Sequence, residues 1–302
     1  MSAEKSIRSW EISKPLSPLR EFAAVWMFVR RQFRLLTFFR LSFITGLLAS
    51  IPQLIIFGVI AKFGQSIPEV QGLSGGYVNF VISGLVINTL LATALSGPYR
   101  GLMDSFWNDR IEIILTSPLR LPVFVTGLSA GNYLDAVLRV MIIIVGAALF
   151  LGFSVTLAPI LLAAPLVLVL GLLACTGLGL AAASSVYTLD ARGGQDPIIL
   201  IVETLSGLVA GVFFPLQLLP HWAQWTVHLI PHTYAIDGMR RAMFGSDKIP
   251  LLPFHHYISL PPIWADCLML AIYAAITLPV GWKLFQYGLR LARMDGRLSR
   301  WT

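Results

Sequence analysis

The stretch of sequence that decides the fold is Val140–Leu189, VMIIIVGAALFLGFSVTLAPILLAAPLVLVLGLLACTGLGLAAASSVYTL, which contains no Asp, Glu, Lys or Arg. A helix needs about 20 apolar residues to cross the hydrocarbon core of a bilayer, so this stretch is long enough for two crossings. A helix of a soluble protein would present a polar face at every turn, and the stretch has none. We therefore predict an integral membrane protein, with a tight turn near 152–159 between two spans.

The rest of the chain has the same character. Charged residues are also absent from 41–61, 70–99 and 204–236. Of all residues 56% are hydrophobic and 12% are charged, about half the charged fraction of a soluble domain. The net charge of +7 comes from basic residues at helix ends and tails, which is typical of topology signals and contacts with anionic lipid headgroups. This placement argues against a nucleic-acid partner.

The predicted fold class is an all-α integral membrane protein with six transmembrane helices. A cytoplasmic tail at 1–18 precedes a single membrane domain at 19–302, which starts with an interfacial amphipathic helix at 19–40 because arginines alternate there with aromatic residues. The predicted spans are about 41–61, 78–97, 131–152, 157–187, 197–214 and 264–287. Prolines break the chain after the fifth span while hydrophobicity continues, so 215–241 is predicted to be an external re-entrant helical hairpin.

The distribution of basic residues predicts the orientation. If the N-terminus is cytoplasmic, only four of the 22 lysines and arginines fall outside: Lys62, Arg240, Arg241 and Lys248. Basic residues accumulate on the cytoplasmic side of membrane proteins. We therefore predict that both termini are inside and that the chain is a multi-pass protein of the cytoplasmic (inner) membrane.

Three polar or broken segments carry motifs. They are Asp104–Arg120 (DSFWNDRIEIILTSPLR), Phe213–Trp222 (FFPLQLLPHW) and Ile230–Arg241 (IPHTYAIDGMRR). In order and spacing they resemble the permease subunits of ABC-2 type transporters, the branch that exports drugs, antibiotics and glycoconjugates. The matching positions are Glu112, Ser117, Pro118, Leu119, Phe214, Pro215, Leu219, Pro220, Trp222, Pro231, Thr233, Tyr234, Asp237 and Arg240. His232 departs from the family pattern, in which leucine is common.

The resemblance implies an ATP-driven exporter. Two permease subunits, here a homodimer, would face each other, and separate ATPase subunits would dock on the cytoplasmic side. The chain contains no G-x-x-x-x-G-K-[ST] phosphate loop, so ATP and Mg would be bound by the partner and this chain would hold no cofactor. The segment 104–119 would be a coupling helix inserted into the ATPase, or else simply a solvated loop helix. Its candidate contact residues are Asp104, Asp109, Arg110, Glu112, Ser117 and Pro118.

Several residues are candidates for the transport path or the dimer interface. Gly207 and Gly211 have the G-x-x-x-G spacing that favours close helix contact, although ordinary packing within one subunit is the alternative. Glu203 is an ionisable group inside a predicted span, where such groups usually face the bundle interior or water. It would pair with Arg139 in a gating network, or be protonated or solvated near the interface. Weaker candidates are Gln53, Asn88, Phe213 and Phe214, and the alternative for the two phenylalanines is lipid contact.

All five histidines lie between the predicted fifth and sixth spans, on the external side: His221, His228, His232, His255 and His256. The pair His228 and His232 has the i, i+4 spacing of two metal ligands, but Pro231 disturbs the helix that would aim both rings together. The two cysteines lie in apolar stretches and indicate neither a disulfide framework nor a metal cluster. We predict hydrogen bonding for the histidines and no metal site.

Other functions fit the sequence less well. The main alternative is an ion-coupled secondary transporter or channel, but the two halves of the chain show no repeat. The segment 72–76 formally matches the G-x-S-x-G hydrolase pattern without the strand and helix that the pattern requires. A scaffold without transport activity is a third possibility. The expected cargo is an amphipathic drug, lipid or lipid-linked molecule, with a polysaccharide or an ion as the alternative.

Overall fold

The computed structural model describes 18–38, scattered positions between 41 and 60, 76–107, 120–154, 163–188, 196–216, 219–220, 224, 226–245, 249, 251–252, 254–255 and 259–294. All regular secondary structure within these ranges is helical, which confirms the all-α class. Four of the helices are long and apolar enough to cross a membrane. They are α6 (Gly76–Trp107), α8 (Leu121–Phe150), α9 (Ala163–Thr188) and α13 (Pro262–Met294).

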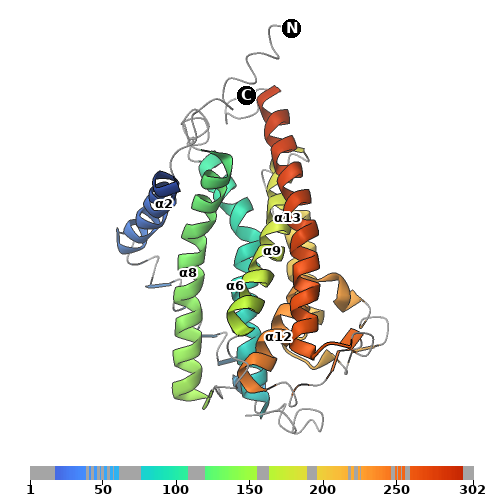
Figure 1. Ribbon diagram of the computed structural model, residues 1–302. Coiled ribbons are helices and arrows are strands. Elements are labelled where there is room, and N and C mark those ends of the chain that lie inside the picture. Colours follow the sequence, from blue (N-terminus) through green and yellow to red (C-terminus); the bar gives the residue numbers. More distant parts are fainter. Residues whose placement is uncertain are drawn as a thin grey trace.

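The long helices lie side by side in a bundle (Figure 1). Contacts such as Gly171 with Leu91 and Gly281 with Gly177 place α6, α9 and α13 next to one another, and α8 packs on the other side of α6. A further helix, α2 (Pro18–Phe38), lies against α8 where α6 ends and α8 begins, and we call this the α2 end. The short helix α12 (Pro231–Phe244) lies at the opposite end, which we call the α12 end.

The core follows α9, which packs on α6 and α13 through glycines. A Cβ atom on Gly177 would lie 2.5 Å from the carbonyl carbon of Thr277, and one on Gly281 would overlap the Gly177 oxygen. On the other side of α9, a Cβ atom on Gly179 would overlap the carbonyl oxygen of Leu95. Small residues allow helix backbones to approach this closely in a membrane, where packing replaces the hydrophobic effect between helices.

The observed helices extend beyond several predicted spans. Helix α6 continues ten residues past the predicted end at 97, α8 begins ten residues before 131, and α13 continues to Met294. Both α6 and α13 pass through an internal proline, Pro98 and Pro279. Hydropathy locates where charged residues begin, but a helix continues for as long as its backbone is hydrogen-bonded, and membrane helices tolerate proline. Helix α9, in contrast, begins at Ala163 rather than at 157.

The predicted fifth span needs a correction. Helix α10 (Pro197–Val209) has thirteen residues, about 20 Å of helix, and stops before the predicted end at Phe214. Gly211 has φ of 77°, a left-handed conformation that ends the helix and that glycine adopts without strain. The chain therefore leaves the α2 end as a helix and reaches the α12 end through irregular backbone.

Two predicted elements are described only in part. About half of the first span at 41–61, including Gln53, lies outside the described residues, and the scattered described positions there are helical. The second half of the predicted re-entrant hairpin contains a single turn of 3₁₀ helix, η3 (Val227–Leu229), followed by α12. Among the described residues, four of the six predicted spans thus correspond to helices of crossing length.

Candidate functional site

At the α2 end, α2 is fixed to α8 by close packing. A Cβ atom on Gly127 would lie 2.5 Å from the ring of Phe28, so only a glycine leaves room for this ring. Gln32 packs closely against Gly131 in the same way. The opposite face of α2 is exposed and apolar. Its exposed large side chains are Leu19, Phe22, Trp26, Met27, Phe33 and Phe38. This division into a packed face and an exposed apolar face, with arginines between them, is typical of a helix that lies in the membrane interface.

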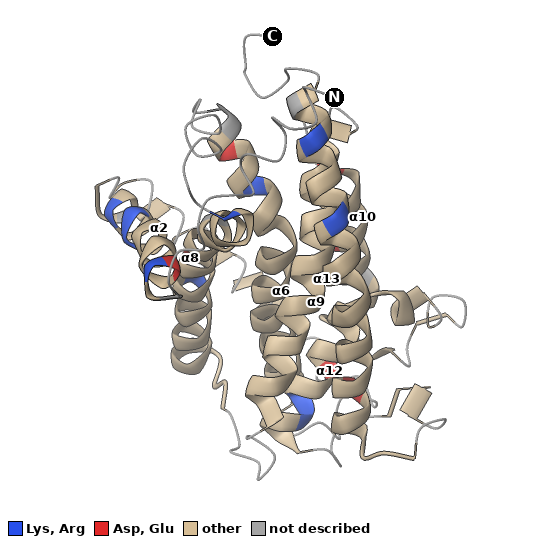
Figure 2. Ribbon diagram, turned by 45° about the horizontal axis from the view of Figure 1, so that its top comes forward, with Lys and Arg blue, Asp and Glu red and all other residues tan. Residues whose placement is uncertain are grey.

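Two ion pairs connect α2 to both borders of the predicted coupling segment. Arg31 Nη2 lies 3.4 Å from Asp104 Oδ2 in the last turn of α6. Arg120, the residue before α8, lies 3.0 Å from Glu21 through its Nη1. These side chains are partly exposed, so each pair stabilises the contact by only about 0–1 kcal/mol. The two pairs matter because of where they lie: they connect α2 to the residues just before and just after the predicted coupling segment. Figure 2 shows the charged residues in this region.

The predicted coupling helix is only partly described. Asp104 and Trp107 belong to the last turn of α6, so a separate helix starting at 104, as predicted, is not formed. The remaining predicted contact residues lie outside the described residues: Asp109, Arg110, Glu112, Ser117 and Pro118. Their role stays a prediction.

The predicted path residues are not brought together. Gly207 has open space where a Cβ atom would be, and Gly211 serves as the left-handed residue after α10, so this pair makes no close helix contact within the described residues. Arg139 does not reach Glu203, because its Nε atom lies 2.9 Å from Asp135 Oδ2, one turn earlier on α8. The pairing of Glu203 with Arg139 is thus not formed, whereas a role at an interface with a second subunit stays a prediction.

Asn88 and the two phenylalanines have different surroundings. The Oδ1 atom of Asn88 is buried without a hydrogen-bond partner among the described residues, which leaves one polar atom of α6 unsatisfied. The carbonyl of Phe213 accepts a hydrogen bond from the Tyr77 hydroxyl at 2.7 Å. Phe214 is exposed, in keeping with lipid contact. Phe213 therefore helps to anchor the irregular backbone after α10 to the first turn of α6.

At the α12 end, the guanidinium of Arg240 holds the broken fifth crossing in place. Its Nη1 donates to the carbonyl of Gly211 at 2.6 Å. Its Nη2 donates to the carbonyls of Phe80 and Val212 at 2.8 and 3.0 Å. These bonds satisfy backbone carbonyls that irregular structure leaves without partners in an apolar environment. Gly84 makes the approach possible, because a Cβ atom there would overlap Nη2 of Arg240.

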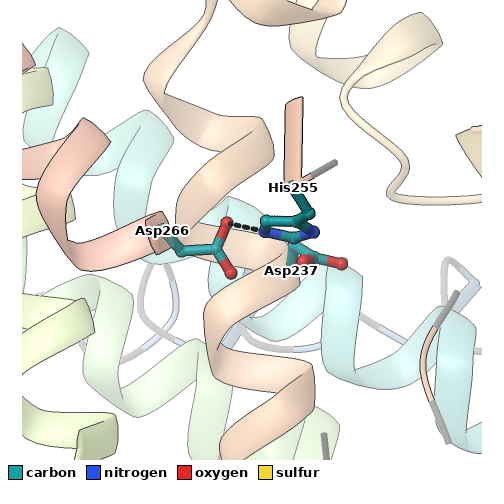
Figure 3. Close-up of side chains that lie close together, drawn as sticks. All are labelled: Asp237, His255 and Asp266. Carbon is teal, nitrogen blue, oxygen red and sulfur yellow. Dashed lines mark hydrogen bonds and ion pairs between the residues drawn. The ribbon is translucent and has the colours of Figure 1, made fainter. Parts of the chain in front are cut away.

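A second buried network joins α12 to α13. Nε of Arg241 lies 2.6 Å from Asp237 Oδ2 and 3.8 Å from Asp266 Oδ2, and all three side chains are at most 10% exposed. Nε2 of His255 lies 3.1 Å from Asp266 Oδ1 (Figure 3). Arg241 also donates to the carbonyl of Ile249 at 3.2 Å. Because Asp237 and Arg241 are on α12 and Asp266 is on the second turn of α13, the network fixes one helix to the other.

The chemistry of this network does not fit a metal ion. The candidate ligand atoms of Asp237, His255 and Asp266 lie within 4.8 Å of one another. However, Nδ1 of His255 accepts the backbone N–H of Leu252 at 3.1 Å, so the proton of the neutral ring is on Nε2, the atom that faces Asp266. A metal ion there would have to displace this proton, whereas ligating histidines normally donate through their other nitrogen. The guanidinium of Arg241 also supplies the positive charge that a cation would bring.

A buried thiol and imidazole lie close together between α9 and α12. Cys175 Sγ is 3.8 Å from His232 Nδ1, and both residues are buried. Burial lowers the pKa of His232 to about 4, so its ring is neutral and does not stabilise a thiolate. A nucleophilic cysteine requires an electropositive, partly exposed setting. The pair is therefore part of the packing between these helices.

The family motif residues frame these networks. Pro231 occupies the first turn of α12, where its missing N–H costs nothing. The Tyr234 ring packs edge-on against Phe254, and its hydroxyl lies 3.2 Å from Nδ1 of His228. Of the remaining motif positions, Pro215 and Pro220 are described in irregular backbone, and Trp222 lies outside the described residues.

Sequence reasoning missed Gly84 and Asp266, and it predicted hydrogen bonding for His255 without identifying its partner. Asp266 is a carboxylate within the predicted sixth span, and this unusual placement was the available signal, because an acid within a span is retained for a partner or a function. Gly84 gave no signal, since nothing local distinguishes a glycine that admits a distant arginine. His255 was considered only for metal binding and for hydrogen bonds in general.

Comparison with known proteins shows the family of the chain. Residues 23–244 match the family model described as ABC-2 type transporter. The chain is 27% identical over 200 residues to the inner membrane transport permease YadH of Escherichia coli (strain K12), covering 66% of this chain and 73% of that protein. It is 26% identical over 243 residues to the putative transport permease ycf38 of Porphyra purpurea, covering 80% and 78%. The chain therefore belongs to the ABC-2 type transporter family, as a multi-pass transport permease of the inner membrane.

Proposed function

We propose that this chain is the membrane subunit of an ATP-driven exporter, with the α2 end and both termini in the cytoplasm. A separate ATPase would dock on the segment between α6 and α8, and a second copy of the chain would complete the transport path. The observation that carries the proposal is the pair of contacts Arg31–Asp104 and Glu21–Arg120, which tie α2 to both borders of that segment.

Helix α6 provides a mechanical connection for such a transporter. It has 32 residues, about 48 Å of helix, and it contacts both ends of the bundle. Asp104 in its last turn pairs with α2. In its first turns, Tyr77 binds the carbonyl of Phe213, and Phe80 binds Arg240. A displacement of α6 by the ATPase would therefore reach the irregular backbone of the fifth crossing directly.

The proposed cargo is an amphipathic drug, lipid or lipid-linked molecule. Large apolar side chains are exposed on the outward faces of two crossing helices, among them Met141 and Leu149 on α8 and Ile272 and Ile276 on α13. Such faces contact lipid or a second subunit, and a path formed between two of them would be apolar. A sugar chain or an ion would need a polar lining.

We expect the charge reversal Glu112→Arg to weaken binding of the ATPase by more than tenfold. Truncating one partner of a buried charge pair at a protein interface costs about 2–5 kcal/mol, and about 1.4 kcal/mol corresponds to tenfold in affinity. The measurement is coexpression of the chain with its candidate ATPase, copurification, and ATPase activity after reconstitution. Lys62→Glu, on the side predicted to be external, is the matched reversal and should leave binding unchanged. If no ATPase copurifies with the wild type, and the chain alone moves a solute along an ion gradient, the exporter proposal fails.

We expect Gly127→Leu to separate α2 from α8 and to reduce ATP-driven transport without unfolding the bundle. The new side chain would collide with the ring of Phe28, and such overpacking costs about 1–3 kcal/mol. Gly97→Ala on α6 is the control, because its Cβ would meet its nearest neighbours at 3.8 Å, an ordinary contact. Proteolytic susceptibility near 38 would report the release of α2. Unchanged coupling in a variant with released α2 would show that α2 does not transmit movement.

A further inference from the structure

The buried network at the α12 end holds two carboxyl groups close together. Atoms of Asp237 and Asp266 lie within 4.8 Å of each other, and both side chains are almost entirely inaccessible. We propose that Asp266 binds a proton at neutral pH, so that a neutral carboxylic acid lies beside the ionised carboxylate of Asp237. The site is thus a proton-binding site between α12 and α13, and it does not depend on the identity of the cargo or of the ATPase.

The protonation of His255 follows from its hydrogen bonds. Its Nδ1 atom accepts the backbone N–H of Leu252 and therefore carries no proton, and its Nε2 atom donates to Asp266 Oδ1 at 3.1 Å. An imidazolium would need a proton on Nδ1, where the N–H of Leu252 already points. The ring is neutral, so it contributes a hydrogen bond but no positive charge to Asp266.

The two arginines nearby, Arg240 and Arg241, make their short contacts with groups other than Asp266. Arg241 Nε makes its short contact with Asp237, at 2.6 Å, and lies 3.8 Å from Asp266. Among the described residues, Arg240 donates to Ser83 and to three backbone carbonyls, so no hydrogen bond of its guanidinium goes to a described carboxylate. Asp237 therefore has a direct counter-charge, whereas the nearest cation to Asp266 among the described residues is the more distant Arg241.

The second oxygen of Asp266 is the decisive atom. Oδ2 is fully buried and has no hydrogen-bond partner in the described part of the chain. An ionised carboxylate with an unsatisfied oxygen is very costly in a buried site, and two carboxylates that share a site cannot both ionise readily. A proton on Oδ2 removes the charge and turns this atom into a donor that faces the Asp237 carboxylate.

Among the described residues, the other titratable groups around the site supply no positive charge. Those facing it from the elements packed around it are Tyr234 on α12, Tyr273 and Cys267 on α13, and His228 in η3. All are neutral groups near pH 7. Burial lowers the pKa of His228, which keeps this ring uncharged as well.

The proton would act as a link between the helices. When it is bound, Asp266 stabilises the contact between α12 and α13. When it leaves, two negative charges lie within 4.8 Å with one guanidinium between them, and the contact weakens. Loss of the proton would thus loosen the α12 end of the bundle at the point where α13 begins.

Infrared spectroscopy of the purified chain tests the protonation directly. We expect the wild type at pH 7 to show the carbonyl band of a buried carboxylic acid, with the small downshift in D2O that an exchanged proton causes. Asp266→Asn should remove this band. Asp104→Asn, which changes an exposed acid in the same way, should not. Because a protonated Glu203 would add a band of its own, the measured quantity is the difference spectrum between the wild type and Asp266→Asn. A difference spectrum without a carboxylic-acid band would overturn the proposal.

Stability as a function of pH provides the second measurement. The native chain would hold one more proton than the unfolded chain, so the stability contributed by Asp266 is complete below about pH 4, the pKa of an unfolded aspartate, and falls as the pH rises. Between about pH 4 and neutral pH, where native Asp266 is protonated and unfolded Asp266 is not, the unfolding equilibrium constant should increase about tenfold per pH unit. Asp266→Asn should fold and lose this dependence, whereas Asp237→Asn should be far less stable, because it removes the counter-charge of Arg241.

A metal ion is the competing occupant. Elemental analysis of the purified wild type should find no stoichiometric divalent metal, and adding a chelator should leave the melting temperature unchanged. If the wild type contains a bound metal and Asp266→Asn does not, the occupant of the site is a metal ion and the proposal of a bound proton is wrong. An equal slope of stability against pH in the wild type and Asp266→Asn would also reject the proposal.

Discussion

Replacing Gly177 by alanine is expected to destabilise the bundle by about 3 kcal/mol or more. The added Cβ atom would lie 2.5 Å from the carbonyl carbon of Thr277 and 2.6 Å from the backbone nitrogen of Leu278. A flexible side chain moves aside easily, but here the obstacle is the backbone of α13, so α9 and α13 must separate. Their whole interface would loosen, including the hydrogen bond from Thr277 to the Ala174 carbonyl. Thermal unfolding in detergent or nanodiscs measures the effect.

Gly207→Ala provides the matched control. It is also a glycine-to-alanine change in an apolar helix, but no atom of the described residues lies within 4 Å of the new Cβ. Alanine favours a helix over glycine by about 1 kcal/mol, so this variant should be as stable as the wild type or slightly more so. If Gly177→Ala has the same melting temperature as Gly207→Ala, the close contact between α9 and α13 is wrong.

The second large effect is expected for Arg240→Met, which should lower stability by about 3–5 kcal/mol. Methionine has a similar reach but leaves the carbonyls of Gly211, Phe80 and Val212 without their donors. Each buried polar group left unsatisfied costs about 1–3 kcal/mol. Arg240→Lys should recover only part of the loss, because an ammonium group lacks the planar fork that reaches several acceptors at fixed geometry.

The control for this change is Arg139→Met on α8. Arg139 is partly exposed and pairs with Asp135 one turn away, an interaction of about 0–1 kcal/mol. The melting temperatures of both variants and of Arg240→Lys should therefore rank as Arg139→Met, Arg240→Lys, Arg240→Met from highest to lowest. A thermally stable Arg240→Met would mean that the irregular backbone after α10 does not need the guanidinium.

The class of fold was predictable because it depends on quantities that are local in sequence. The uncharged stretches identified the membrane helices without any knowledge of their partners. The ends of the helices were less predictable: α6 continues through Pro98, just past the predicted end at 97, and α13 continues beyond the predicted end at 287. The early end of α10 depends on the left-handed Gly211, and a glycine in a G-x-x-x-G pattern gives no indication of its φ angle.

The candidate sites were predictable only where a family motif identified them. Asp237 and Arg240 were singled out by resemblance, but their partners lie far away in sequence, and no spacing rule connects Arg240 to Phe80 or Asp237 to the start of α13. The charge count used for orientation treated Arg240 and Arg241 as residues of an external loop. Both are buried and bonded, so they do not act as free loop charges. Removing them leaves Lys62 and Lys248 on the external side, which strengthens the predicted asymmetry.

The late position of α13 in the chain has a consequence for biosynthesis. Until the ribosome has made 262–294, Gly177 of α9 lacks its neighbour on α13, and the pair Asp237–Arg241 on α12 lacks Asp266. The partly made chain would therefore keep exposed backbone and an incomplete charge network within the membrane, and insertion chaperones would have to shield both. Arrival of α13 closes the two defects together, so we expect the chain to complete its packing only when this helix has been made.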